Sequence, residues 1–377
     1  MPQLFGSKEL VDDVHKRDLC IGCGACVELC PYFKNYRGKT SQLFACSLSQ
    51  GRCFAYCPKA EADLDELSRR MWNTSYDARP LGVYRAIVAA RSGEAMPKGR
   101  FQAGGTVSAL MVCAMQRGLV DVAALTGRNG LIPEPRLVTR WQDVPAAAGS
   151  QFMASPTLAG VNLAARQGYK KIGVVGTPCQ MLAVAQMRTN PLAKEEHHVP
   201  VTLAIGLFCN WSLDTRQLNA LLSGRVAAGT IRGMDIPPPP ANVLILETDK
   251  GSEEISLSEI KPLIPHTCFT CLDLTSEFAD LSVGMFEGRP GWNTLVVRSE
   301  TAARLVADAQ ADGLLTTEPM PAETVAHLTA AAAAKKERSL RILLQRDLVN
   351  TVNGQRAAVR IPREAMARIL PPRDSNR

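Results

Sequence analysis

Apolar and polar stretches alternate regularly through the middle of the chain, from about residue 83 to residue 250. Short apolar runs there predict strands, at 83–90, 120–125, 171–175, 201–208 and 243–247. The stretches between them predict helices, at 106–117, 158–167 and 178–188. Strands that alternate with helices are typical of an α/β sheet, so we predict an α/β fold for this part of the chain.

The segments on either side of this region have a different character. Residues 1–60 hold most of the cysteines, which is typical of a small domain folded around metal. Residues 61–82 are polar and predict a helical linker, and the Ala-rich chain after about residue 300 predicts helices. We therefore expect four parts: a metal-binding segment at 1–60, the linker at 61–82, an α/β domain at 83–300 and a helical C-terminal region at 301–377.

The composition fits a cytoplasmic protein of two or three domains, at about 100–200 residues per domain. The chain has 377 residues, of which 46% are hydrophobic, and its net charge is +7. No stripe interleaves basic and aromatic residues, which argues against nucleic-acid binding, although a basic pocket would suit an anionic ligand. The longest apolar run, 199–209, is shorter than the roughly 18 residues that a membrane span requires, and the N-terminus does not resemble a signal peptide.

Twelve cysteines change this picture, because cysteines in a reducing compartment are more often metal ligands than disulfides. Residues 20–31 have the C-x2-C-x2-C-x3-C-P spacing of bacterial ferredoxins, in which three thiolates hold one [4Fe–4S] cluster and the fourth reaches a second. Gly22 and Gly24 let the backbone wrap closely around the sulfurs. Zinc is the alternative, but it seldom needs four cysteines in so tight a series. We therefore predict a ferredoxin-like segment.

The second half of this ferredoxin-like pattern is irregular. Cys53 and Cys57 keep the C-x3-C-P spacing, but Ser47 and Gln50 stand where two earlier cysteines are expected, and Cys46 precedes the first of these positions.

If the ferredoxin crossing of ligands holds, each of two clusters takes cysteines from both halves. The first cluster would take Cys20, Cys23, Cys26 and Cys57. The second would take Cys30, Cys46 and Cys53, with one ligand unaccounted for. It would be either a [3Fe–4S] cluster or a [4Fe–4S] cluster with an oxygen or solvent ligand. The alternative is that these three cysteines are structural.

Four later cysteines fall where α/β folds present ligands: Cys179, Cys209, Cys268 and Cys271. Cys179 follows a threonine and a proline suited to a helix start, where the helix dipole favours a thiolate. Cys209 ends the predicted strand at 201–208, at the carboxyl edge where open sheets bind ligands. These cysteines could hold a further cluster. Two alternatives remain: Cys179 could be a nucleophile, or Cys268 and Cys271 could form a dithiol redox pair.

The glycine loop Gly104-Gly105-Thr106 follows one predicted strand and opens a predicted helix. The free N–H groups at a helix start favour phosphate, although two glycines before a helix are also a common turn. Residues 173–176 do not form the dinucleotide pattern G-x-G-x-x-G, so we do not predict a conventional NAD site.

Five motifs occur in a fixed order along the chain: Gly-Gly-Thr-Val-Ser-Ala at 104–109, Gly-Thr-Pro-Cys-Gln at 176–180, Gly-Leu-Phe-Cys at 206–209, Cys-Phe-Thr-Cys-Leu-Asp at 268–273 and Ala-Asp-Leu-Ser-Val-Gly at 279–284. Together they resemble the family of coenzyme F420 hydrogenase/dehydrogenase beta subunits over roughly residues 80–300. A preceding ferredoxin-like segment is a common addition in that family.

The resemblance implies an FAD-binding α/β domain with a [4Fe–4S] cluster of its own, which brings the expected number of clusters to three. Its cluster ligands would be Cys179, Cys209, Cys268 and Cys271. The residues near the flavin would be Gly104, Gly105, Thr106, Gly176, Thr177, Asp280 and Gly284.

The resemblance also implies an oxidoreductase. Clusters pass single electrons and a deazaflavin exchanges hydride, so a flavin belongs between them. We expect this chain to be a subunit of a larger complex with a hydrogenase or dehydrogenase partner. It would pass electrons between its clusters and a soluble hydride carrier, coenzyme F420 or similar. The alternatives are a ferredoxin-dependent reductase of an organic double bond and a passive electron-transfer subunit. No catalytic side chain is assigned, and the lone His266 is expected to be structural.

Overall fold

The computed structural model describes residues 3–99, 101–238, 240–352 and 355–371. Within this part, the largest sheet has eight strands in the order β14-β4-β13-β12-β8-β7-β5-β6. Their bounds are β4 Ala86–Ser92, β5 Val122–Asn129, β6 Ile132–Val138, β7 Ile172–Gly176, β8 Val201–Leu207, β12 Leu281–Met285, β13 Asn293–Val297 and β14 Leu315–Pro319. Strands β4, β12, β8, β7 and β5 run in one direction, so their carboxyl ends meet at one edge of the sheet.

Helices cover both faces of this sheet because successive side chains of a strand point to opposite faces. On one face, α4 (Thr106–Gln116) and α9 (Glu300–Ala311) pack against Leu203 and Ile205 of β8. On the other face, α5 (Thr157–Arg166) and α6 (Pro178–Thr189) pack against Ala204 of the same strand. Burial on both faces explains why the sequence of β8 is apolar almost throughout.

The structure is a mixed α/β fold, in agreement with the predicted class, and the predicted central elements are present with ends shifted by a few residues. Four strands of the sheet were not predicted: β12 and β13 in its middle, and β6 and β14 at its two edges. Strand β6 contains Pro133 and Pro135, which are tolerated because an edge strand leaves some N–H positions unpaired. Strand β14 pairs with β4 although it lies in the region expected to be only helical, and its sequence is largely polar.

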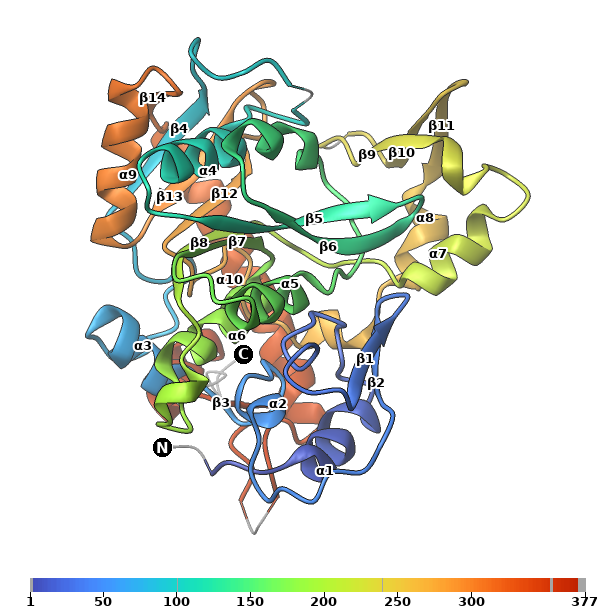
Figure 1. The fold of residues 1–377 in the computed structure, drawn as a ribbon, viewed down its shortest axis with the longest axis vertical. Helices are drawn as coiled ribbons and strands as arrows, with labels where there is room; N and C mark the ends of the chain where they lie inside the picture. Colours follow the sequence, from blue (N-terminus) through green and yellow to red (C-terminus); the bar gives the residue numbers. More distant parts are fainter. Residues whose placement is uncertain (1–2, 100, 239, 353–354, 372–377) are drawn as a thin grey trace, which may run out of the picture.

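The N-terminal segment, blue in Figure 1, lies below the large sheet and packs on α5. Its elements are short: α1 Ser7–Leu10, a π-helical turn Val11–His15, β1 Phe33–Tyr36, β2 Lys39–Gln42 and α2 Arg52–Ala55. Asn162 of α5 donates hydrogen bonds from Nδ2 to the carbonyls of Ala25 (3.0 Å) and Val27 (2.7 Å). Gly24 has a φ of +86°, and a Cβ there would lie 2.6 Å from the Pro156 carbonyl oxygen, so this contact requires glycine.

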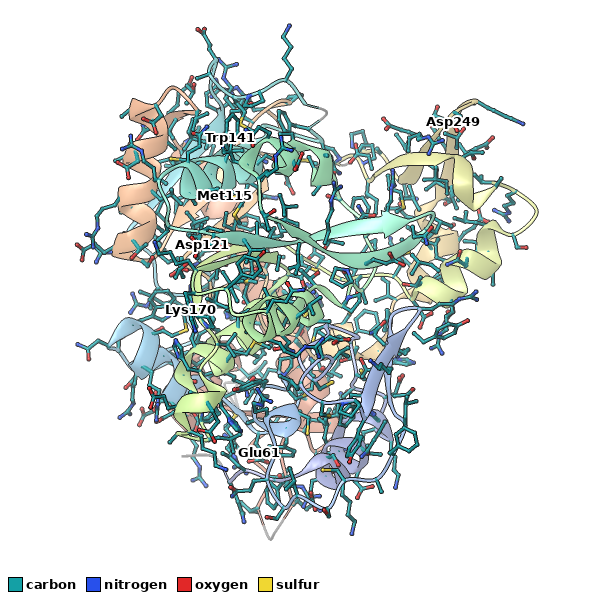
Figure 2. The ribbon with its side chains drawn as sticks, in the orientation of Figure 1. Glu61, Met115, Asp121, Trp141, Lys170 and Asp249 are labelled. Atoms are coloured by element: carbon teal, nitrogen blue, oxygen red, sulfur yellow. The ribbon has the colours of Figure 1, made fainter. Side chains whose placement is uncertain are left out.

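The C-terminal region folds back over the rest of the chain. Helix α10 (Ala322–Gln345) runs from the large sheet down into the lower half of the view, where the N-terminal segment lies (Figure 1). Strand β15 (Val359–Arg360) pairs with β3 (Ala62–Asp63), which precedes α3 (Leu64–Trp72), and α11 (Arg363–Ile369) follows. Arg360 forms an ion pair of 2.5 Å with Glu61, which Figure 2 labels in the lower half of the view. The linker and the C-terminus therefore hold each other in place.

A second, smaller sheet stands at the side of the molecule (Figure 1). It contains β9 (Ile231–Asp235), β10 (Val243–Thr248) and β11 (Gly251–Ser256), all antiparallel. With α7 (Thr215–Leu222) and α8 (Leu257–Ile260) it encloses a small apolar core of its own, which includes Leu218 and Leu246. A helix with the length and apolar character to cross a bilayer does not occur among the described residues.

Candidate functional site

The first cysteine group consists of Cys20, Cys23, Cys26 and Cys57. Burial raises the pKa of Cys57 to about 12, and the charge of Cys20 contributes to this increase. Burial also raises the pKa of Cys23 and of Cys26 well above the usual value, and the charges of Cys20 and Cys57 contribute in both cases. The structure therefore brings together the four side chains predicted to hold one cluster. Thiols that are buried and crowded in this way favour a cationic ligand that stabilises their deprotonated form.

His15 is a neighbour of this group that sequence analysis missed. Burial raises the pKa of Cys20, but a hydrogen bond and the charge of His15, helped by backbone hydrogen bonds, outweigh it and the net shift is downward. The His15 ring also packs edge-on against Phe33, with 6.0 Å between the ring centroids. Its position five residues before the motif gave no recognisable signal.

The second group consists of Cys30, Cys46 and Cys53. Burial raises the pKa of Cys53 to about 11, and the neighbouring Cys30 and Cys46 add to the increase. All three residues are half-buried, as are Cys20, Cys26 and Cys57 of the first group, in which only Cys23 is fully buried. Cys46 lies in a stretch whose other residues, 43–45 and 47–50, are all exposed, so the second group reaches the protein surface at this point.

The third group consists of Cys179, Cys209, Cys268 and Cys271. Thr177 caps α6 through reciprocal hydrogen bonding with Gln180, and this fixes Cys179 in the first turn. Burial raises the pKa of Cys179 to about 12, with Cys271 as the largest charged contributor. Burial raises the pKa of Cys209 as well, and the other three cysteines contribute. The four cysteines therefore converge, whereas the nearby His266 is exposed.

Lys335 is a second residue that sequence analysis missed. It lies on α10 and is 4% exposed, and its Nζ donates to the carbonyls of Cys209 (2.5 Å) and Asp273 (2.7 Å). Burial lowers the pKa of Lys335, but the charges of Cys271 and Cys209 outweigh it and the net shift is upward. Lys335 therefore places a positive charge beside the third group. The only sequence signal was a pair of lysines interrupting an Ala-rich helix.

Lys59 occupies the boundary between the first and third groups. It is buried, and its Nζ donates to Thr270 Oγ1 (2.8 Å) and to the Thr267 carbonyl (3.3 Å), on the turn that carries Cys268. Its charge lowers the pKa of both Cys57 and Cys179, against the larger effect of burial. A cavity of about 50 Å³ beside it is lined by residues that include Cys179 and Cys271. The N-terminal segment thus meets the third group directly.

The glycine loop lies at the carboxyl edge of the sheet, next to the end of β12. Asn293 links the two, because its Nδ2 donates to the Gly284 carbonyl (3.1 Å) and its Oδ1 accepts from the Thr106 amide (3.4 Å). Gly105 has a φ of +76°, and a Cβ on Gly104 would lie 2.7 Å from Asn293 Oδ1. Both glycines therefore have a packing role in addition to the expected contact with flavin, and sequence analysis missed Asn293.

The remaining predicted flavin residues are divided between two places. Gly176 and Thr177 lie at the carboxyl end of β7, beside Cys179. Asp280 precedes β12 and so lies at the opposite end of that strand from Gly284. Its Oδ2 accepts from Arg188 (2.7 Å) and from the Ala204 amide (2.8 Å), so Asp280 stabilises the packing of α6 on the sheet. The structure does not bring Asp280 together with the glycine loop.

Over the described part of the chain, no three His, Cys, Asp or Glu side chains are placed to hold a single metal ion. A four-iron cluster, in contrast, takes one thiolate on each iron. Its four ligands therefore stand around the cluster, farther apart than the ligands of a single ion. The 4Fe–4S binding domain profile matches residues 14–32, which include the first ferredoxin-like motif. Fold and site together define an iron–sulfur protein of the electron-transfer class.

The α/β part matches two profiles of one family. The profile for the N-terminal part of coenzyme F420 hydrogenase/dehydrogenase beta subunits matches residues 87–162, and that for the C-terminal part matches residues 169–323. The chain belongs to this family of coenzyme F420 hydrogenase/dehydrogenase beta subunits, whose members are components of oxidoreductases. This confirms the family predicted from the five motifs.

Individual relatives agree with this assignment. The beta chain of the coenzyme F420 hydrogenase of Methanosarcina barkeri is 28% identical over 246 residues, which cover 64% of this chain and 84% of the relative. One of the subunits of the F(420)H(2) dehydrogenase of Methanosarcina mazei is 24% identical over 306 residues, 77% of this chain and 82% of the relative. A chain in the F420-reducing [NiFe] hydrogenase complex from Methanosarcina barkeri is 26% identical with a TM-score of 0.64, covering 72% of this chain and 95% of its own.

Proposed function

We propose that this chain passes electrons between three iron–sulfur clusters and a hydride carrier, coenzyme F420 or a similar deazaflavin, through FAD. The three cysteine groups would hold the clusters, with four thiolates in the first group, three in the second and four in the third. The relatives named as hydrogenase and dehydrogenase subunits support the further proposal that this chain works in a complex with a partner of that kind.

The observation that carries the proposal is the continuity of the three cysteine groups. Cys53 of the second group interacts electrostatically with Cys26 and Cys57 of the first. Cys23 of the first group interacts in the same way with Cys179 of the third. The groups are thus neighbours in the order second, first, third, from the exposed stretch around Cys46 to Cys179 at the start of α6. Single electrons move efficiently only between neighbouring centres, so a series of neighbouring groups suits electron transfer.

FAD would supply the chemistry that links one-electron transfer to hydride transfer. One feature of the sheet edge supports a bound group there: the Thr106 hydroxyl is buried without a hydrogen-bond partner within the part of the chain that the structure describes. An unpaired buried hydroxyl costs about 1–3 kcal/mol, which a ligand that bonds it would offset. Gly176 and Thr177 would hold such a ligand next to the third group, because Cys179 follows them directly.

The test of this function is hydride exchange with a one-electron acceptor. Reduced coenzyme F420 is mixed with oxidised viologen and anaerobically purified protein, and the appearance of oxidised coenzyme is followed by absorbance. We expect protein-dependent turnover with the deazaflavin and none with NADH or NADPH in parallel assays. Turnover with a nicotinamide alone would contradict the choice of hydride carrier and leave the cluster assignments intact.

Thr106→Val tests the flavin site more cleanly than a change at the glycines. A Cβ on Gly105 would strain a positive φ and lie 2.9 Å from the Phe101 ring whether or not flavin binds. Valine has nearly the shape of threonine, so Thr106→Val should leave the free energy of unfolding of the flavin-free protein unchanged or higher. We expect its FAD dissociation constant to rise about tenfold, the loss of about one hydrogen bond.

Both quantities are measured on the same preparations, unfolding by urea and FAD binding by fluorescence quenching. Thr329→Val is the matched control, because the Thr329 hydroxyl donates to the Val325 carbonyl of its own helix (2.7 Å) and lies outside the proposed flavin site. An unchanged FAD affinity in Thr106→Val would remove the hydroxyl from the proposed flavin site.

A further inference from the structure

The surface above the second cysteine group is unusually apolar. Leu43, Phe44 and Leu48 are 54%, 64% and 67% exposed and surround Cys46 in the chain. We call residues 43–50 the Cys46 loop; every residue in it except Cys46 is exposed. Large apolar side chains gathered on a surface are typical of a protein interaction site. The exposed apolar surface therefore lies next to Cys46 of the second cysteine group.

The same part of the chain is basic. Residues 29–60 contain no Asp or Glu, and their basic residues are Lys34, Arg37, Lys39, Arg52 and Lys59, of which Lys59 is buried and does not contribute to the surface. Two of the basic side chains have acidic partners outside this stretch, in the pairs Lys34–Glu28 (3.6 Å) and Lys39–Asp18 (3.1 Å). Arg37 is exposed and lies over the Tyr36 ring, 5.2 Å from its centroid, and among the described residues it has no carboxylate partner. A basic surface of this kind fits an acidic partner.

We propose that the Cys46 loop is the docking site of a small acidic iron–sulfur electron carrier. The inference rests on the proposed function, because it requires a cluster at Cys30, Cys46 and Cys53. One electron would pass from the reduced cluster of the carrier to the second cluster, or in reverse, and no bond or proton would change place. The loop lies outside both family profiles of the α/β part, which begin at residue 87, so the carrier would meet a surface that those profiles do not include.

The test measures how fast the clusters of the full-length protein are reduced in a stopped-flow experiment. The protein reductant is a reduced bacterial two-cluster ferredoxin, an acidic carrier, and the small-molecule reductant is dithionite. We expect the rate with ferredoxin to fall as salt is added, because screening weakens attraction between opposite charges. Dithionite, which does not require docking, reports whether the clusters themselves are intact.

Two variants separate the apolar from the charged contribution. Phe44→Ser/Leu48→Ser and Arg37→Glu should each slow reduction by ferredoxin about tenfold at low salt, within the range that steering and docking contribute. Arg37→Glu should also show a weaker dependence on salt. Leu344→Ser is the matched control, because Leu344 is an apolar side chain 47% exposed on α10, and it should react like the unmodified protein.

Several outcomes would overturn the proposal. Equal rates for all variants with ferredoxin would exclude the Cys46 loop as the docking site. Failure of ferredoxin to reduce a protein that dithionite reduces would exclude the acidic carrier. A change from dimer to monomer in Phe44→Ser/Leu48→Ser, measured by analytical ultracentrifugation, would show that a second copy of the chain covers this surface. The coenzyme F420 and viologen assay bypasses the loop, so a failure of docking is distinguishable from a failure of the proposed function.

Discussion

Lys336→Met is expected to lower the free energy of unfolding by about 3–5 kcal/mol, the usual cost of removing one partner from a buried ion pair. Lys336 and Glu277 form an ion pair with side chains 2% and 4% exposed, and Lys336 Nζ also donates to the Tyr76 hydroxyl (3.2 Å). Burial raises the pKa of Glu277 to about 7 even with the lysine present. Without Lys336 this buried carboxylate would keep only the weaker effect of the Arg298 charge, or would have to bind a proton.

The measurement is urea unfolding followed by tryptophan fluorescence under anaerobic conditions. Arg341→Met is the matched control on the same helix, because the Arg341–Glu337 pair is about half exposed on both sides and should contribute only about 0.3–0.5 kcal/mol. Adding Glu277→Gln to Lys336→Met should recover part of the loss by removing the unpaired charge. A loss below about 1 kcal/mol in Lys336→Met would show that the pair does not hold α10 in place.

The second large effect is expected in the metal content. The unmodified protein should contain about 11–12 iron atoms per chain. The first and third groups would each hold a [4Fe–4S] cluster, and the second group would hold either a [3Fe–4S] or a [4Fe–4S] cluster. Cys23→Ser should lose about four of the iron atoms and keep its flavin, because none of the four cysteines of the first group is among the residues proposed to hold the flavin. Cys268→Ser should also lose about four but should bind flavin more weakly, since the third group adjoins Gly176 and Thr177.

Iron and acid-labile sulfide are determined chemically, and the remaining clusters are identified by electron paramagnetic resonance after reduction. Cys113→Ala is the control, because Cys113 is fully buried in the apolar core and belongs to none of the three groups. It should retain all of the iron. About four iron atoms in the unmodified protein would mean that two of the three proposed sites are empty or wrong.

Sequence analysis predicted strands β4, β5, β7 and β8 of the large sheet but not β12 and β13 in its middle, and it singled out the cysteines that the structure brings into three groups. Ligand spacing in the chain is a local property, and the apolar runs of β7 and β8 are long enough to be recognised. The edge strands were harder, because β6 contains prolines and β14 is mostly polar, so neither has the apolar pattern of a buried strand. Their place in the sheet depends on pairing with distant neighbours.

The supporting residues of the site could not be predicted because they act across long separations in the chain. Lys335 contacts Cys209 from 126 residues away, and Lys59 reaches Thr270 across 211 residues. Each is an ordinary lysine by sequence, and only burial beside the cysteines distinguishes it. Asp280 shows the reverse case: the motif around it is recognisable, but its carboxylate is used to hold Arg188 and the Ala204 amide.

The path of α10 bears on how the protein is made. The cysteines of the N-terminal segment leave the ribosome early. Lys335, which contacts the third group, and β15, which pairs with β3 of the linker, are made much later. During synthesis the cysteines of all three groups would therefore be present before the last part of their enclosure exists. Cluster insertion would have to precede or accompany the docking of this C-terminal region.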